Sequence, residues 1–178
     1  QFNTRDDGGN LAIEGYFAVF DSNYEIAPGM SESIAPGAFD KTLSGDIRAL
    51  INHDTTLVIG RTTNGTLELK VDSRGLWGRI KVNPNDTEAV NIYQRTARGD
   101  ITGCSFGFEI ESETRTVSDD GSVHYMINKV NPLYEVSLTP FPAYEATHIE
   151  ARHRDEENFK KRSLDEWKNA MKAKLKGE

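Results

Sequence analysis

The sequence has few of the residues that crosslink a chain, bind zinc or cross a membrane. Its 178 residues include one cysteine, Cys104, so no internal disulfide can form and a reducing compartment is favoured. That cysteine and four scattered histidines show no zinc-ligand spacing of the CxxC type. No apolar run approaches the roughly 20 residues that span a bilayer, and no basic-then-apolar leader opens the sequence. These absences argue against a disulfide scaffold, a zinc site, a membrane partner and secretion.

An excess of basic residues is also missing. Lysine and arginine number 21 against 28 aspartates and glutamates, which gives a formal net charge of −7. Residues 152–178 differ, because their nine basic and six acidic residues give +3 and leave −10 for residues 1–151. The basic residues of this tail are interleaved with acidic ones and form no patch. A nucleic-acid partner is therefore not expected.

The composition is typical of a soluble globular protein. Hydrophobic residues make up 37%, charged residues 28%, and mean hydropathy is −0.59. The length suits one domain with a real hydrophobic core. We predict two parts, a β domain over residues 1–151 and a charged linker with a C-terminal helix over residues 152–178.

Alternating apolar residues, the pattern of half-buried strands, dominate the first part. Residues 66–71 and 76–82 both alternate and flank the turn 72–75, which predicts a hairpin. Further strands are predicted at 11–20, 47–51, 102–113, 123–130, 134–139 and around 147–150. Together they predict a mainly β fold with a few helices (α+β), built as a small closed β-barrel or strongly curved sheet.

Three helical segments accompany these strands. One runs from a cap at Asp86 or Thr87 to a stop at Gly99. Residues 36–43 predict only a short helical turn, since no good capping residue precedes them. The last helix begins at a capping box at Ser163 and carries one apolar stripe. That stripe can dock on a scaffold helix, on a second copy of the chain or on its own barrel; it consists of Leu164, Trp167, Met171 and Leu175.

The first residue suited to catalysis is His53, which follows the apolar strand 47–51 directly. A histidine titrates near neutral pH, so it can act as a general base. The alternative is a surface histidine beside Asp54 in a turn.

The second is Ser105, in the strand that begins at Gly103. Alternation places Cys104 and Phe106 on one face and Ser105 with Gly107 on the other. Small neighbours give a substrate backbone access to the serine and leave main-chain N–H groups for an oxyanion. The alternative is a strand packed tightly against another backbone, and Cys104 is expected to fill the core.

The third is Glu135, in a strand where Tyr134, Val136 and Leu138 are expected to share one face. Glu135 then points with Ser137 to the other face, where a carboxylate can orient the imidazole of His53. The alternative is a solvated strand charge. Only the combination of base, nucleophile and carboxylate makes a catalytic interpretation attractive.

With these residues in place, the chain resembles a known family, the tailed-phage prohead (capsid maturation) proteases. The resemblance covers about residues 11–152 and rests on short motifs that follow one another in order. These are Ile13 to Asp21, Ile34 to Phe39, Asn52-His53-Asp54, Gly60-Arg61-Thr62, Gly65-Thr66-Leu67, Gly103 to Phe108 and Glu135 to Leu138.

The resemblance implies a serine endopeptidase similar in fold to the herpesvirus capsid-maturation proteases, a closed β-barrel flanked by helices. It implies His53 as general base and Ser105 as nucleophile, with no metal or organic cofactor. The third member is Glu135 by our choice, with His148, His124 and Asp54 as alternatives. Arg61 either shapes the site or forms a structural ion pair.

The resemblance also implies where the protein acts and on what. The substrates are the scaffold protein and extensions of the major capsid protein, cut inside the assembling procapsid in the host cytoplasm, with self-cleavage and self-association as further expectations. Two other functions stay open: a catalytically silent β-barrel that binds scaffold or assists capsid assembly, and a Ser-His esterase or amidase. A peptide-length groove beside Ser105 would favour the protease, and a closed small pocket the esterase.

Overall fold

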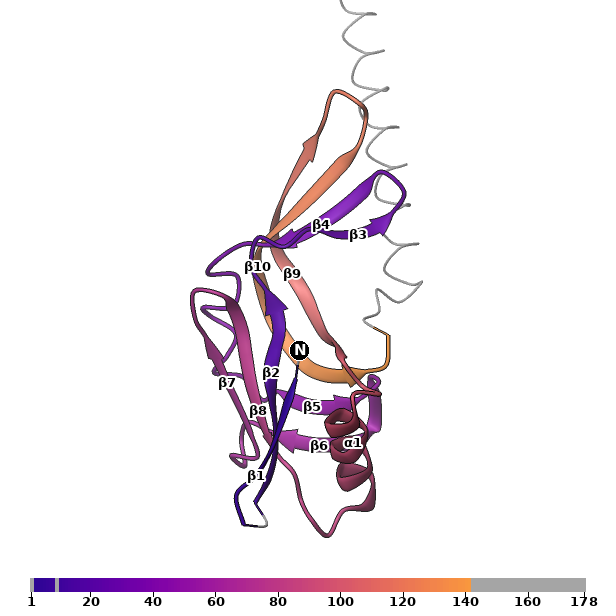
Figure 1. Cartoon of the computed structure of the whole chain (residues 1–178). Helices are drawn as coiled ribbons and strands as arrows, with labels where there is room; N and C mark the ends of the chain where they lie inside the picture. The colour runs from indigo at the N-terminus through magenta and orange to yellow at the C-terminus, as the bar shows by residue number, and fades with distance from the viewer. Residues whose placement is uncertain (1, 9, 142–178) are drawn as a thin grey trace, which may run out of the picture. The chain divides into compact units, whose positions relative to one another are not determined.

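The computed structural model describes residues 2–8 and 10–141, which belong to one compact unit, Gln1–Ala143 (Figure 1). The predicted domain boundary at residue 151, the predicted strand around 147–150 and the predicted C-terminal helix lie outside the described residues.

Ten strands in two sheets and one helix make up the described part of the chain. The first sheet is antiparallel and has the order β1 (Asn3–Asp6), β2 (Leu11–Val19), β8 (Gly75–Lys81) and β7 (Leu67–Val71). The second has the order β3 (Tyr24–Ala27), β4 (Met30–Ile34), β10 (Val123–Thr139), β5 (Arg48–Ile51) and β6 (Asp54–Arg61), with β9 (Gly103–Val117) paired to β10. The predicted α+β class dominated by strands is confirmed.

The predicted closed barrel is wrong for the residues that the structure describes. Closure requires strand pairing all the way round, whereas here the two sheets remain separate and each keeps its own edge strands. One main-chain link between them is a corner at Thr66, whose N–H donates to Arg61 of β6 and whose carbonyl accepts from Lys81 of β8. Alternation predicts individual strands, but it does not say which strand edges pair with one another.

Strand β10 is the spine of the second sheet. Strand β9 pairs with it antiparallel from Val123 to Thr139, whereas β4 and then β5 pair with it in parallel on the opposite side. Figure 1 shows β4 beside the upper part of β10 and β5 beside its lower end. The two strands predicted at 123–130 and 134–139 are therefore one strand.

A bulge in β10 corrects the predicted faces around the site. Leu133 pairs with Phe108 and Glu135 with Gly107, so Tyr134 is an extra residue with no partner in the register. Tyr134, which was expected to share a face with Val136, is 49% exposed. Leu133 is buried in the core with Val136 instead. Period-two counting fails here because the bulge shifts the alternation by one residue.

The core lies between the sheets and the helix. Strand β2 contributes Ile13 and Phe17, β8 contributes Leu76 and Ile80, and β10 contributes Val136 and Leu138. The helix α1 (Thr87–Arg98) adds its buried face, which includes Ala89 and Ile92. As predicted, Asp86 caps its first turn, accepting from two main-chain N–H groups, and Gly99 ends it at a φ of 88°.

Other elements differ from the prediction. The alternation does not predict β1, β3, β4 or β6, because these strands are short or carry exposed polar runs. Residues 36–43 form successive turns, not a helix, with i to i+3 main-chain bonds. Residues 118–121 form a turn, with Gly121 at a φ of 84°.

Candidate active site

His53 occupies an unusual position in a two-residue turn. Ile51 at the end of β5 pairs with Asp54 at the start of β6, so only Asn52 and His53 form the loop. Both have positive φ, 52° and 61°, as the tight turns of type I′ require. The second position of such a turn usually holds glycine, so a histidine there carries backbone strain of about 1 kcal/mol. The turn thus projects an imidazole at the cost of local stability.

The imidazole of His53 meets the carboxylate of Glu135. Nδ1 of His53 lies 2.7 Å from Oε1 of Glu135, and the two side chains are 22% and 12% exposed. A carboxylate oxygen only accepts hydrogen bonds, so Nδ1 carries the proton of the neutral ring. The other nitrogen, Nε2, is then the acceptor, which is the tautomer that a general base needs.

Nε2 of His53 is buried and has no hydrogen-bond partner among the described residues. A buried polar atom without a partner costs about 1–3 kcal/mol, so it calls for an explanation. An acceptor kept open for the proton of a nucleophile is such an explanation.

Ser137 connects the same two residues a second time. Its Oγ donates to Oε2 of Glu135 at 2.6 Å and accepts from the main-chain N–H of His53 at 3.1 Å. Ser137 is fully buried. The sequence places Ser137 on the face of Glu135, but these contacts also depend on the turn at His53, 84 residues away.

Ser105 lies on the neighbouring strand, directly opposite Ser137 in the register of β9 and β10. Side chains of directly paired residues share one face of a sheet, with Cβ atoms about 5 Å apart. The next pair on this face is Gly107 with Glu135, and a Cβ built on Gly107 would lie 2.7 Å from Oε1 of Glu135. Ser105, which is half-buried, therefore shares the face that carries Glu135 and Ser137.

Cys104 faces the opposite way, as expected from the alternation. It packs against the core, with Sγ 3.3 Å from the carbonyl oxygens of Tyr16 and Phe17. Burial raises the pKa of the Cys104 thiol to about 11. At neutral pH the sulfur is protonated and is a poor nucleophile.

The structure gives two of the alternative orienting groups other partners. Oδ1 of Asp54 accepts from the main chain and the hydroxyl of Thr56, and these bonds lower the pKa of Asp54. His124 lies at the other end of β10, on the order of 30 Å along the strand from Glu135. Its Nδ1 and Nε2 lie 2.9 Å from the hydroxyls of Ser31 and Ser33. His148, the third alternative, lies outside the described residues.

Arg61 forms an ion pair away from the imidazole. Its Nε and Nη2 each lie 2.6 Å from a carboxylate oxygen of Asp46, and this guanidinium holds the pKa of Asp46 down at about 2. Thr63 and Arg48 also contact Asp46. This contact supports the structural interpretation of Arg61.

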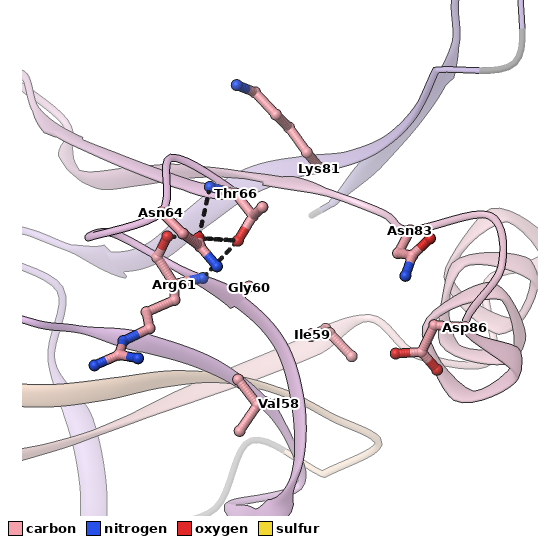
Figure 2. A pocket seen from close by; sticks show the side chains of 9 residues that line it. All are labelled: Val58, Ile59, Gly60, Arg61, Asn64, Thr66, Lys81, Asn83 and Asp86. Atoms are coloured by element: carbon pink, nitrogen blue, oxygen red, sulfur yellow. Dashed lines mark hydrogen bonds between the residues drawn. The ribbon is translucent and has the colours of Figure 1, made fainter.

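An open hollow of about 340 Å³ lies beyond β6 (Figure 2). In Figure 2 the side chains of Asp86 and Asn83 border one side of it, and Asn64 bonds to Thr66 on the other. None of His53, Ser105 and Glu135 lines this hollow. It is therefore not the small closed pocket beside the serine that an esterase would need.

Within residues 2–8 and 10–141, no three His, Cys, Asp or Glu side chains converge as the ligands of a metal ion would. No helix in those ranges is both long enough and apolar enough to pass through a bilayer.

Comparison with known proteins identifies the family. A search of curated proteins finds no match. A family model described as caudovirus prohead serine protease matches residues 1–162, which is most of the chain and includes both strands and the turn of the site. The family is one of serine peptidases that act in the phage prohead. The chain therefore belongs to the caudovirus prohead serine proteases.

Proposed function

We propose that this prohead protease uses Ser105 as its nucleophile, His53 as its general base and Glu135 as the carboxylate that orients the base. The observation that carries the proposal is the 2.7 Å contact between Nδ1 of His53 and Oε1 of Glu135. It fixes the tautomer with Nε2 as acceptor, and Nε2 has no other partner among the described residues. A catalytically silent assembly module has no need of such an acceptor.

In the proposed mechanism Nε2 of His53 takes the proton of Ser105 as Oγ attacks the scissile carbonyl carbon. The resulting imidazolium is stabilised by Glu135 and then gives its proton to the leaving amine as the peptide bond breaks. Water, activated in turn by His53, hydrolyses the acyl-enzyme and restores Ser105. The hydrogen bond from Ser105 to His53 forms when substrate is bound, since catalytic hydrogen bonds are often long in free enzymes.

The proposed substrates are the scaffold protein and extensions of the major capsid protein, together with this chain itself. The family supports this choice, because a protease of the prohead works where those polypeptides are assembled, in the host cytoplasm. A second copy of the chain is a further proposed partner.

The test mixes the purified chain with scaffold and major capsid protein of the same phage and follows fragment masses over time. The variants are Ser105→Ala and, as matched control on the same strand, Ser112→Ala. We expect cleavage by wild type and Ser112→Ala and a loss of about 10⁴- to 10⁶-fold in Ser105→Ala. Equal cleavage by all three would remove Ser105 from the mechanism. Absence of cleavage by wild type even inside assembled proheads would favour the silent module.

A further inference from the structure

We infer that Gly107 and Ser137 are positioning residues, which together form a seat that holds the Glu135 carboxylate against His53. The inference rests on the proposed function, since it concerns the same base and carboxylate. Neither residue touches the reacting atoms in this role. Each acts on Glu135, Ser137 through a hydrogen bond and Gly107 by having no side chain.

Ser137 holds the carboxylate by hydrogen bonding. Its hydroxyl donates to Oε2 of Glu135, the oxygen that does not contact His53, and so leaves Oε1 for Nδ1. The same hydroxyl accepts the main-chain N–H of His53, which ties the backbone of the base to the side chain of its partner. A glutamate has three rotatable side-chain bonds, so a second fixed oxygen sharply restricts where the first can point.

Gly107 holds the carboxylate by leaving space. A Cβ on Gly107 would lie 2.7 Å from Oε1 of Glu135, too close for both atoms to stay in place, and 3.2 Å from Cγ, which is also tight. No positive φ is found at Gly107, so the strand backbone itself would accept a side chain. What excludes one is the carboxylate, which lies where that side chain would be.

The turn that carries His53 depends on the same strand. The N–H of Asn52 donates to the carbonyl of Leu138 at 2.9 Å, and the N–H of His53 donates to Ser137. These two bonds fasten a strained turn to β10. Loss of the Ser137 hydroxyl therefore loosens base and carboxylate together.

The experiment measures the rate at which a fluorophosphonate probe labels Ser105 in the full chain, with the labelled peptide identified by mass spectrometry. The variants are Gly107→Ala and Ser137→Ala. The matched control is Ser33→Ala, which also removes a buried serine hydroxyl bonded to a histidine of the same sheet. We expect labelling to slow by about 10- to 100-fold in the first two variants, within the range of general-base catalysis, and to stay unchanged in the control.

Two further measurements separate positioning from a structural effect. Added to a Glu135→Ala chain, Ser137→Ala and Gly107→Ala should cause no further slowing, because the group on which they act is gone. The downfield proton signal of His53 Nδ1 in the NMR spectrum should be lost from both single variants. Ser137→Thr, which keeps the hydroxyl, should restore the signal and the labelling rate.

The outcomes distinguish this inference from the function on which it rests. Labelling of Gly107→Ala and Ser137→Ala at the wild-type rate, while His53→Ala labels slowly, would overturn the seat and leave the triad intact. Labelling of Ser105 that is unaffected by His53→Ala would overturn the proposed function itself. Equal slowing in the Ser33→Ala control would show that buried serines act through stability, and would also overturn the seat.

Discussion

Two histidines lie at opposite ends of β10, His124 within the strand and His53 in a turn bonded to it, and their surroundings differ in one decisive respect. His124 has a serine hydroxyl 2.9 Å from each ring nitrogen, so both nitrogens are satisfied. His53 has a carboxylate at Nδ1 and no partner at Nε2 among the described residues. Both rings have serine hydroxyls nearby, yet only one has an acceptor left for chemistry.

The comparison teaches that residue types alone do not define a serine-protease site. At His124 the hydroxyls of Ser31 and Ser33 complete the hydrogen bonding of the ring, which is a structural arrangement. At His53 the neighbouring serine, Ser137 of β10, bonds to the carboxylate and the main chain instead of the ring. A carboxylate on one nitrogen and an unsatisfied second nitrogen distinguish a potential base from a core histidine.

The largest predicted effect is on activity. His53→Ala should lower peptidase activity by about 10⁴- to 10⁶-fold, because the proposed base and nucleophile would act as one unit. His124→Ala should leave activity within several-fold of wild type, measured as the rate of fragment formation from scaffold. A loss of activity of similar size in both variants would contradict the prediction that only His53 is needed for catalysis.

A smaller effect, on stability, is expected at His124. His124→Ala leaves the hydroxyl of Ser33, which is 2% exposed, without its partner. The free energy of unfolding should fall by about 1–3 kcal/mol, the cost of a buried polar group that loses its hydrogen bond. Urea denaturation of the full chain measures this, and an unchanged midpoint would contradict the structural role of His124.

The smallest effect isolates the strained backbone at His53. His53→Gly and His53→Ala both remove the imidazole and should be equally inactive. At a φ of 61°, the glycine variant should nevertheless be about 1 kcal/mol more stable than the alanine variant. Paired denaturation curves test this difference, and equal midpoints would show that the turn carries no strain that matters.

Much of the site could be predicted from the sequence because its signals are local. Alternation along 103–108 separates Ser105 from Cys104, and the structure shows Cys104 against the core. The helix is equally local, since Asp86 and Gly99 mark its ends directly. The meeting of Glu135 with His53 was a hypothesis that spacing alone could not establish.

What failed depends on contacts between distant segments. The bulge at Tyr134 arises from the pairing of β10 with β9, and no residue type in 133–136 predicts it. Closure of a barrel depends on which strand edges meet, which alternation does not specify. The hydrogen bonds of Ser137 likewise cannot be predicted from nearby residues, because one of its two partners, His53, belongs to a turn more than eighty residues earlier.

The late position of β10 has a consequence for how the enzyme matures during synthesis. The strand pairs with β4 and β5, and each paired residue of those strands lies more than eighty residues before its partner, so these contacts have high sequence separation and form slowly. A nascent chain that has not yet produced Glu135 holds a histidine without its carboxylate and a serine without its paired strand. In the proposed mechanism the chain therefore gains peptidase activity only after β10, the last strand among the described residues, has been synthesised.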